Sequence, residues 1–344
     1  MEVLYKQQDK QKYFKHYMSF LEKKQLPLSY HPYIIKYFHL IAKPIEDKSF
    51  VVIENQQCVG ICYCPIYEIN GKKHISNNGG YTPIPIGENE RITKHLFNLL
   101  DEIAIQTSCS SIRLYVDSQY STQFINQRMM SDTENMLLLK KYGYIDTSSI
   151  NTIADLTLPQ EEMRKRLRKS YKPLINSYMK KSCYSIHKIT QSNPNKDIHD
   201  QYVHFHHLCS GRKTRSDESF EIQYQMLLDG FATLFGLCYN KDFIGFCYFF
   251  HHFHYVTYHS GADDPKYEGS KIPIYHLILW NAFCDFHKMG YVSCNMSQPS
   301  NFSVLQGFGD YSDEKQINIA SFKRGVGGGL LLLFEGLNIL IKNA

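Results

Sequence analysis

The chain has 344 residues, of which 43% are hydrophobic and 21% are charged. This composition excludes an intrinsically disordered protein, and the length is near twice that of an ordinary domain. Lys and Arg outnumber Asp and Glu by 38 to 33, a net charge of +5, and so small an excess identifies no partner by itself.

Apolar periodicity and turn residues predict alternating helices and strands along the whole chain, which is typical of a mixed α/β protein. In the first half we expect helices over residues 6–22, 31–38, 96–106 and 135–141, and strands over 50–53, 59–69 and 112–116. In the second half we expect a basic helix that opens at 159–162, helices over 199–210 and 273–289, and strands over 154–158, 184–189, 231–239 and 243–257.

A long internal repeat indicates how these elements are organised. Residues 55–63 (NQQCVGICY) and 240–248 (NKDFIGFCY) share a pattern of Asn, a β-branched residue, Gly, an apolar residue, Cys and Tyr. Each segment precedes a further strand, a Gly-containing turn closed by proline, and a long helix. The repeated unit exceeds the ~20 to 50 residues of a solenoid repeat. The sequence therefore predicts two copies of one domain, over residues 1–150 and 151–344.

Three segments of the second copy resemble the FemAB/FemX-like group, in which two GNAT acyltransferase domains occur in one chain. They are a strand followed by a basic helix (154–176), a strand, turn and long helix with a Gly-aromatic end (258–291), and SFKRGVGG (321–328), similar to the group's Phe-Lys-x-Gly-x-Gly run. The resemblance implies two GNAT-like domains, each with a central, mostly antiparallel twisted sheet flanked by helices.

The resemblance also implies an activity. We expect an N-acyltransferase that moves an acyl group from acyl-CoA to an amino group of an amino sugar or nucleotide-sugar, in surface-polysaccharide or cell-envelope synthesis. One alternative is FemX-like transfer of an amino acid from aminoacyl-tRNA to a peptidoglycan precursor. Another is a noncatalytic protein that binds RNA or a nucleotide-sugar in a basic cleft, because tyrosines suited to stacking lie among the basic residues of 164–181.

The donor site is expected where a helix follows the central hairpin. Free N–H groups and the positive end of the helix dipole favour phosphates there, and the acyl carbonyl could bind backbone N–H groups where two central strands part. The residues at this place are Lys266, Tyr267, Gly269, Ser270 and Lys271. They depart from the usual GNAT glycine pattern, and the alternative is a tight turn with two solvated lysines. No covalent nucleophile and no tightly bound cofactor are expected.

The acceptor site needs fixed cations. Lys323 resembles the lysine of the group that contacts the pyrophosphate of a nucleotide-sugar, with Phe322 beside it. Four residues apart on the expected basic helix, Arg168 and Lys172 would share a face. The other candidates are Tyr171, Tyr258, and Arg212 or Arg215 from the loop at 211–219. Each cation alone is more simply a solvated surface residue.

Proton transfer is assigned to His259 and Asp264. Histidine titrates near neutral pH, and both residues lie near the turn where the acceptor amine would arrive. The alternative is a strand histidine bonded to a neighbouring carbonyl. Alternation along a strand would put His251 and His259 on one face, opposite His252. We expect no metal site, since the sequence has no zinc-type Cys-x-x-Cys pair.

The remaining features concern the compartment and the C-terminus. The 10 cysteines lie largely within apolar elements, and no secretory signal is visible, so we expect a protein of the reducing cytoplasm. Residues 330–341 form an apolar run shorter than the ~20 residues of a membrane-spanning helix. We expect a helix docked on the second domain, with contact to a membrane surface as the alternative. Trp280, the one tryptophan, is expected in the core.

Overall fold

The computed structural model describes residues 1–117, 140–297 and 314–340. The helix expected over 135–141 falls largely outside these residues. Contacts divide the chain into two units. Of the described residues, unit 1 contains 1–117, 140–149 and 332–340, and unit 2 contains 150–297 and 314–331.

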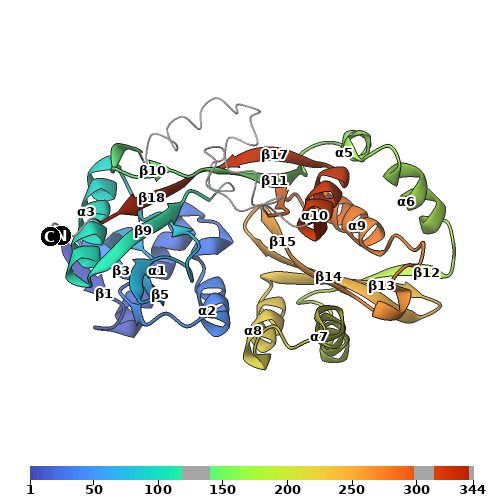
Figure 1. Ribbon diagram of the computed structural model, residues 1–344, viewed down its shortest axis with the longest axis horizontal. Helices are drawn as coiled ribbons and strands as arrows, with labels where there is room; N and C mark the ends of the chain where they lie inside the picture. The colour runs from blue at the N-terminus through green and yellow to red at the C-terminus, as the bar shows by residue number, and fades with distance from the viewer. Residues whose placement is uncertain (118–139, 298–313, 341–344) are drawn as a thin grey trace. The chain divides into compact units, whose positions relative to one another are not determined.

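Unit 1 combines two sheets with three helices in its described part (Figure 1). One sheet has the strand order β1-β3-β4-β8, and the other has the order β10-β18-β9-β6-β5-β2, with β7 also paired to β9. Its helices are α1 (Lys10–Lys24), α2 (Pro32–Ile41) and α3 (Glu90–Gln106), with a 3-10 turn, η1 (Leu28–Tyr30). Its strands are β1 (Glu2–Tyr5), β2 (Glu46–Asp47), β3 (Phe50–Glu54), β4 (Gln57–Cys62), β5 (Pro65–Ile69), β6 (Lys72–Ile75), β7 (Thr82–Pro83), β8 (Ile86–Gly87), β9 (Cys109–Tyr115), β10 (Ile145–Asp146) and β18 (Glu335–Ile339).

Unit 2 is built on one sheet with the strand order β12-β13-β14-β15-β16-β11-β17. Helices cover both faces of this sheet (Figure 1). Its strands are β11 (Ser149–Asp155), β12 (Tyr184–Ile189), β13 (Ala232–Tyr239), β14 (Asp242–His252), β15 (Tyr255–Asp263), β16 (Ser293–Asn295) and β17 (Gly328–Leu333). Its helices are α5 (Gln160–Arg166), α6 (Tyr171–Met179), α7 (Lys196–Ser210), α8 (Asp217–Leu228), η3 (Pro265–Tyr267), α9 (Ile274–Lys288) and α10 (Glu314–Gly325).

The two copies of the sequence repeat form the same structure. In each unit the Asn of the motif and the residue after it have positive φ, at 50° and 63° for Asn55 and Gln56 and at 49° and 75° for Asn240 and Lys241. They form the two-residue turns of the β3–β4 and β13–β14 hairpins, for which Asn is well suited because it tolerates positive φ. The sequence repeat is thus a repeat of one hairpin.

The helix and the strand that follow the hairpin also recur. In unit 1, α3 precedes β9, which pairs with β6 in parallel; in unit 2, α9 precedes β16, which pairs with β15 in parallel. In each unit a further antiparallel strand then pairs with the parallel one, β18 with β9 and β11 with β16. The expected mixed α/β class with two GNAT-like domains is therefore confirmed.

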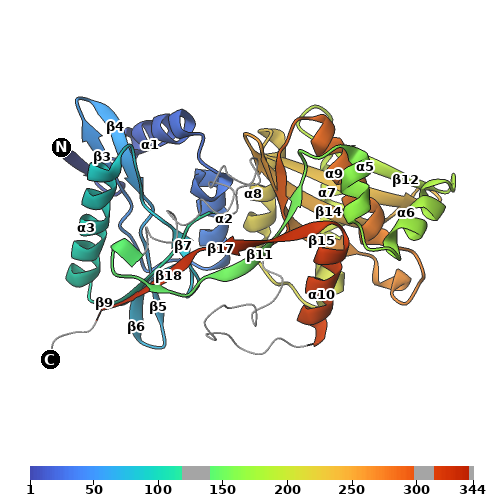
Figure 2. The ribbon, with the colours of Figure 1, turned by 90° about the horizontal axis from the view of Figure 1, so that it is seen from above.

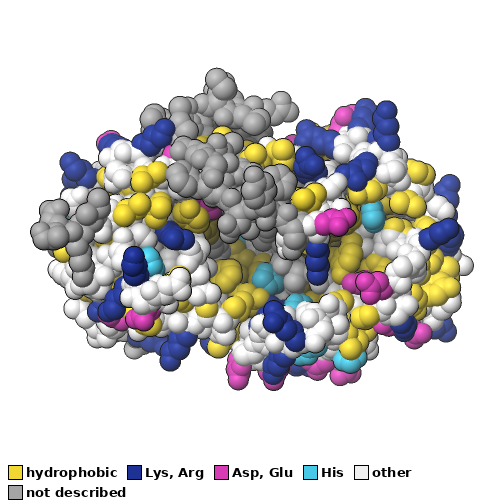
Figure 3. All heavy atoms as spheres, viewed as in Figure 1, with side chains coloured by type: hydrophobic (Ala, Val, Ile, Leu, Met, Phe, Trp, Pro, Cys, Tyr) yellow, Lys and Arg dark blue, Asp and Glu magenta, His cyan; other side chains and the backbone are white. Residues whose placement is uncertain are grey.

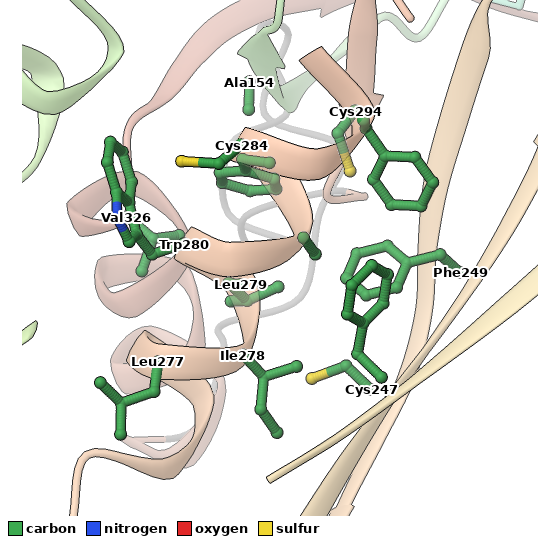
Figure 4. Packing of buried hydrophobic residues seen from close by; sticks show 14 of the residues in the cluster. Ala154, Cys247, Phe249, Leu277, Ile278, Leu279, Trp280, Cys284, Cys294 and Val326 are labelled. Atoms are coloured by element: carbon green, nitrogen blue, oxygen red, sulfur yellow. The ribbon is translucent and has the colours of Figure 1, made fainter. Parts of the chain in front are cut away.

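The core of unit 2 lies between α9 and the sheet (Figure 4). Ile278 of α9 points toward Cys247 of β14, and Trp280 lies on the other side of the helix beside Val326, within the same buried cluster. Trp280 is 4% exposed, as expected for a core residue. This packing fixes the start of α9 against the end of β15, where the candidate site is found.

The C-terminal helix expected over residues 330–341 is wrong. The segment forms two strands, β17 next to β11 in unit 2 and β18 between β9 and β10 in unit 1 (Figure 2). An apolar run of this length fits a buried strand as well as a helix, and only its pairing partners, distant in sequence, decide between them. The last strand that the structure describes, β18, therefore belongs to unit 1 and not to unit 2.

The prediction of one basic helix through Arg168 and Lys172 is also wrong. The chain forms α5 up to Arg166, leaves the helix at Leu167, and starts α6 at Tyr171. Pro173 explains the break, because its ring would clash with the carbonyl four residues earlier in an uninterrupted helix. The N–H of Arg168 instead donates to the carbonyl of Gly325 at the end of α10, at 2.8 Å.

The strand expected over residues 243–257 is interrupted by a turn. His252 pairs with Tyr255, so Phe253 and His254 form the tip of the β14–β15 hairpin. The β14–β15 register shifts where Tyr248 pairs with Ser260 and Phe249 pairs with Tyr258, which makes His259 an extra residue in β15, a β-bulge.

Candidate active site

The sheet of unit 2 parts between its two parallel strands. β15 runs from Tyr255 to Asp263, but β16 pairs only with Tyr255, Val256 and Thr257. Beyond Thr257, β15 still pairs with β14 on one side, but no described strand pairs with it on the other side. Backbone groups along an edge of this kind can bind a carbonyl without any particular side chain.

Two tyrosines and an aspartate meet beside this edge. A Cβ atom on Gly261 would lie 2.5 Å from a ring carbon of Tyr275 and 2.6 Å from the hydroxyl of Tyr258. Only glycine allows both rings to approach the strand here. The Tyr275 hydroxyl donates to Asp263 Oδ1 at 2.6 Å. Burial raises the pKa of both tyrosines, so their hydroxyl groups stay protonated.

Aromatic rings connect this edge to α6 and α10. The Phe322 ring of α10 lies 4.9 Å from His276, 6.2 Å from Tyr171 and 6.4 Å from Tyr275 between ring centroids. A Cβ atom on Gly325 would lie 2.5 Å from the Tyr171 ring, so this glycine of the SFKRGVGG segment is required by close packing. We call Tyr171, Tyr275, His276 and Phe322 the α9–α10 cluster.

His276 was not singled out by the sequence, although it lies in the first turn of α9. Its Nε2 atom is buried and has no hydrogen-bond partner among the described residues. Burial, together with the nearby Arg168, lowers the pKa of His276 to about 4, so the imidazole is neutral at pH 7. The only sequence signal was its place near the start of the helix expected at the donor site.

Two cations accompany the cluster. Lys323, next to Phe322 on α10, is half-buried, and burial lowers its pKa. It has no acidic partner among the described residues, unlike the paired lysines of the same unit. Arg168 stacks on Tyr171, with its guanidinium carbon 5.0 Å from the ring centroid, and donates to the carbonyl and hydroxyl of Ser321 at 2.9 and 2.8 Å.

The basic side chains around α5 and α6 form an exposed patch, visible over α5 in Figure 3. Lys172 belongs to this patch and not to the α9–α10 cluster. Its ammonium group donates to the carbonyl of Lys165 at 3.1 Å. Because the helix is interrupted between them, Arg168 and Lys172 do not share a helix face as expected.

The expected donor loop leads directly into α9. The N-cap residue of α9 is Pro273, which offers no side-chain cap, so backbone N–H groups of the first turn are left for other acceptors. Lys266 is paired with Asp264 at 2.7 Å and lies over the Tyr267 ring. The remaining expected residues of the loop have modest roles: Gly269 has a positive φ of 74°, the Ser270 hydroxyl accepts from Ile272 N, and the Lys271 carbonyl accepts from Tyr178.

His259 and Arg215 lie together on the opposite face of the sheet. The Ser260 hydroxyl is 2.7 Å from the hydroxyl of Tyr202 in α7, whereas the neighbouring Gly261 faces Tyr275 in α9. His259 stacks on Phe250, which lies on the α7 side of the sheet, with ring centroids 4.1 Å apart. The bulge brings His259 to this face, so the expectation that His251 and His259 share a face is wrong.

Arg215 holds this second group together. It donates to the Tyr202 hydroxyl at 2.9 Å and to Gln223 Oε1 at 2.8 Å, and its Nη1 lies 3.4 Å from His259 Nε2. Burial, and then Arg215 and His206, lower the pKa of His259 to about 3. The imidazole is therefore neutral at pH 7 and is not poised near neutral pH as expected.

The sequence-predicted residues thus fall into three groups. Arg168, Tyr171 and Phe322 follow one another in contact on the α9 side of the sheet, where Tyr258 also lies, and Lys323 is next to Phe322 on α10. Arg215 and His259 lie on the α7 side. Asp264 and the donor loop lie beyond the end of β15; at ~3.3 Å per residue, five residues put Asp264 roughly 16 Å along the chain from His259.

The described residues contain no cluster of three or more His, Cys, Asp or Glu side chains arranged to hold a metal ion. Within the same ranges, no helix combines the length and apolar character needed to cross a membrane.

Several solved structures share this fold, among them the following three. FemX has a TM-score of 0.62 at 11% identity, over 88% of this chain and 91% of its own. L-PGS from Bacillus licheniformis has a TM-score of 0.61 at 13% identity, over 96% and 93%. The C-terminal domain of a protein assigned as a lysylphosphatidylglycerol synthetase, from Agrobacterium fabrum, has a TM-score of 0.54 at 10% identity, over 88% and 87%.

These similarities establish the fold: the chain has the tandem GNAT-like architecture of the FemX-like group, which the sequence resemblance predicted. No protein-family model matches the sequence, and no curated protein matches it.

Proposed function

We propose that this protein is a transferase that moves an acyl or aminoacyl group to an amino group of a phosphate-bearing acceptor, such as a nucleotide-sugar used in cell-envelope synthesis. Unit 2 would hold the reacting groups. The acyl carbonyl would lie along the open edge of β15, and the acceptor phosphates would bind at Lys323 beside the α9–α10 cluster.

The observation that carries this proposal is the state of Lys323. A half-buried ammonium group without an acidic partner among the described residues is costly, and the lowered pKa of Lys323 reflects that cost. A bound phosphate would supply the missing negative charge. The rings of Tyr171 and Phe322 would offer flat apolar surfaces to a sugar or base.

Acyl-CoA is the proposed donor, with its phosphates at the uncapped start of α9. Aminoacyl-tRNA is the second candidate, and one observation favours it. One of the two loop lysines, Lys266, already pairs with Asp264, which leaves less positive charge for a pyrophosphate. The exposed basic patch of α5 and α6 could instead contact an RNA backbone.

Binding measurements with full-length protein test the acceptor site. We expect Lys323→Ala to weaken binding of UDP-amino sugars by about tenfold or more, since a charge-assisted hydrogen bond is lost. Binding of the donor should stay within about twofold, and Lys323→Arg should retain part of the acceptor affinity. Isothermal titration calorimetry gives both constants. Lys315→Ala, at an exposed position of the same helix, is the matched control.

Transfer itself is measured by mass spectrometry of the acceptor after incubation with acetyl-CoA or with aminoacyl-tRNA. The donor that yields a modified acceptor identifies the reaction. Equal loss of donor and acceptor binding in Lys323→Ala would contradict the assigned role of Lys323. Binding of RNA of any sequence, with no transfer from either donor, would replace the proposal by a noncatalytic binding function.

A further inference from the structure

Unit 1 contains a cavity far in sequence from the residues of the candidate active site. It has a volume of about 370 Å³ and lies among α1, α2 and the ends of β3 and β4. This volume lies within the range of small-molecule sites. Its lining residues are Lys6, Lys10, Tyr13, Phe14, Tyr17, Pro32, Ile35, Lys36, His39, Ser49 and Tyr63.

The inner wall of this cavity is apolar. Tyr13, Tyr17 and Ile35 are 2%, 1% and 9% exposed, so they belong to the packed interior of unit 1. The Tyr17 hydroxyl already donates to the Tyr30 carbonyl at 2.6 Å, so it is not a polar group open to a ligand. Such a wall suits an alkyl or aryl group and offers little to a sugar.

Cations surround this wall. Lys6 is compensated, because it pairs with Asp47 at 2.5 Å. Burial acts to raise the pKa of Asp47, but Lys6 and Ser49 hold it below its ordinary value, so the pair is ionised. Lys10 and Lys36 are exposed and have no acidic partner among the described residues. Two positive charges are thus left at one cavity.

A histidine adds a neutral polar group to the cavity wall. His39 Nε2 lies 2.8 Å from the Tyr63 hydroxyl, and burial lowers the pKa of His39. Burial also raises the pKa of Tyr63, so both groups are uncharged at pH 7 and share one hydrogen bond. They add no charge that would offset the two lysines.

We propose that this cavity binds an amphipathic phosphate, with the apolar part against Tyr13, Tyr17 and Ile35 and the phosphate between Lys10 and Lys36. The two uncompensated lysines match the double charge of a phosphate monoester better than the single charge of a carboxylate. The same chemistry could come from a soluble alkyl phosphate or from the head group of a membrane lipid. This site is independent of transfer in unit 2.

Calorimetry with full-length protein and octyl phosphate tests the proposal. We expect binding that the double variant Lys10→Ala/Lys36→Ala weakens by about tenfold or more, because two charge-assisted contacts are lost. Inorganic phosphate lacks the apolar part and octyl glucoside lacks the charge, so each should bind much more weakly. Ile35→Phe, which fills the cavity and keeps every lysine, should also weaken binding.

Lys43→Ala is the matched control, since Lys43 is an exposed lysine of unit 1 that does not line the cavity. Unchanged octyl phosphate binding in the double lysine variant would overturn the proposal, as would equal binding of inorganic phosphate. Sedimentation with vesicles of phosphatidylcholine that contain phosphatidic acid examines the lipid source. If the double variant no longer binds the vesicles, the ligand is a lipid head group. If the double variant still binds the vesicles but does not bind octyl phosphate, the cavity is not the lipid site and the proposal is refuted.

Discussion

At the scale of single residues, His259 shows how neighbours decide the chemistry of a side chain. Its ring stacks on Phe250, and the Arg215 guanidinium lies 3.4 Å from its Nε2. Both the desolvated position and the positive neighbour disfavour the protonated imidazole. A neutral His259 can accept a hydrogen bond from a ligand or from Arg215, but it is a weak base at pH 7.

A titration followed by NMR tests this description. Because the pKa of His259 is lowered to about 3, its imidazole resonances should stay those of the neutral form from about pH 8 down to about pH 4. His259→Gln identifies the resonances by their loss. A midpoint near the ordinary value of ~6.5 would contradict the described contacts with Arg215 and Phe250.

The same lowered pKa has a consequence for stability. The unfolded chain binds a proton at His259 near pH 6.5, whereas the folded protein does so only near its lowered pKa. The stabilisation is therefore complete above about pH 6.5 and is lost as the pH falls from there towards about 3. His259→Gln should lose less stability on acidification than the unchanged protein.

Single residues of the candidate site were predictable to different degrees. Phe322 and Lys323 were found because the resemblance names a motif at their position. The location of His259 depended on a bulge between β14 and β15, which no local pattern reveals. His276 became visible only when its ring was found between Tyr171 and Phe322, which come from other helices.

At the scale of elements, the repeated hairpins explain the repeated glycine. A Cβ atom on Gly60 would lie 2.9 Å from Ile92 of α3, and one on Gly245 would collide with Ile274 of α9. In each unit the glycine lets a helix lie directly on the hairpin. The sequence repeat therefore preserves a packing contact as well as a turn.

Gly245→Ala should destabilise unit 2 by about 1–3 kcal/mol, because the added methyl group overpacks the contact with Ile274. Urea unfolding measures the change. Gly329→Ala is the control, since its Cβ atom would make only an ordinary contact of 3.6 Å with the Ile153 carbonyl. The double variant Gly245→Ala/Ile274→Ala should lose less unfolding free energy than the sum of the losses in the two single variants, because Ile274→Ala removes the clash. Losses that simply add would contradict a clash between these two side chains.

Elements set by local pattern were largely predictable, and those set by distant partners were not. The long helices expected over 96–106 and 273–289 correspond to α3 (Glu90–Gln106) and α9 (Ile274–Lys288). Their apolar periodicity is a local property. The strands β17 and β18 were missed because their partners lie in β11 and in β9 and β10, more than a hundred residues away.

At the scale of the whole molecule, the C-terminal strand completes the unit formed by the start of the chain. β18 pairs with β9 through Leu337 and Arg113, and with β10 through Leu337 and Ile145. The second copy of the repeat lies between these partners in the sequence. Unit 1 therefore depends on the last residues of the chain for a strand that has neighbours on both sides.

Leu337→Pro should consequently loosen unit 1 selectively. Proline cannot donate to a neighbouring strand and is poorly tolerated in a strand with partners on both sides. We expect amide exchange in β9 to accelerate by about 100-fold, as for a loss of roughly 3 kcal/mol, while β13 and β14 in unit 2 keep their protection. Hydrogen exchange with mass spectrometry reports both. Leu337→Ala, which keeps the N–H group, should have a much smaller effect, and equal acceleration in both units would show that they unfold together.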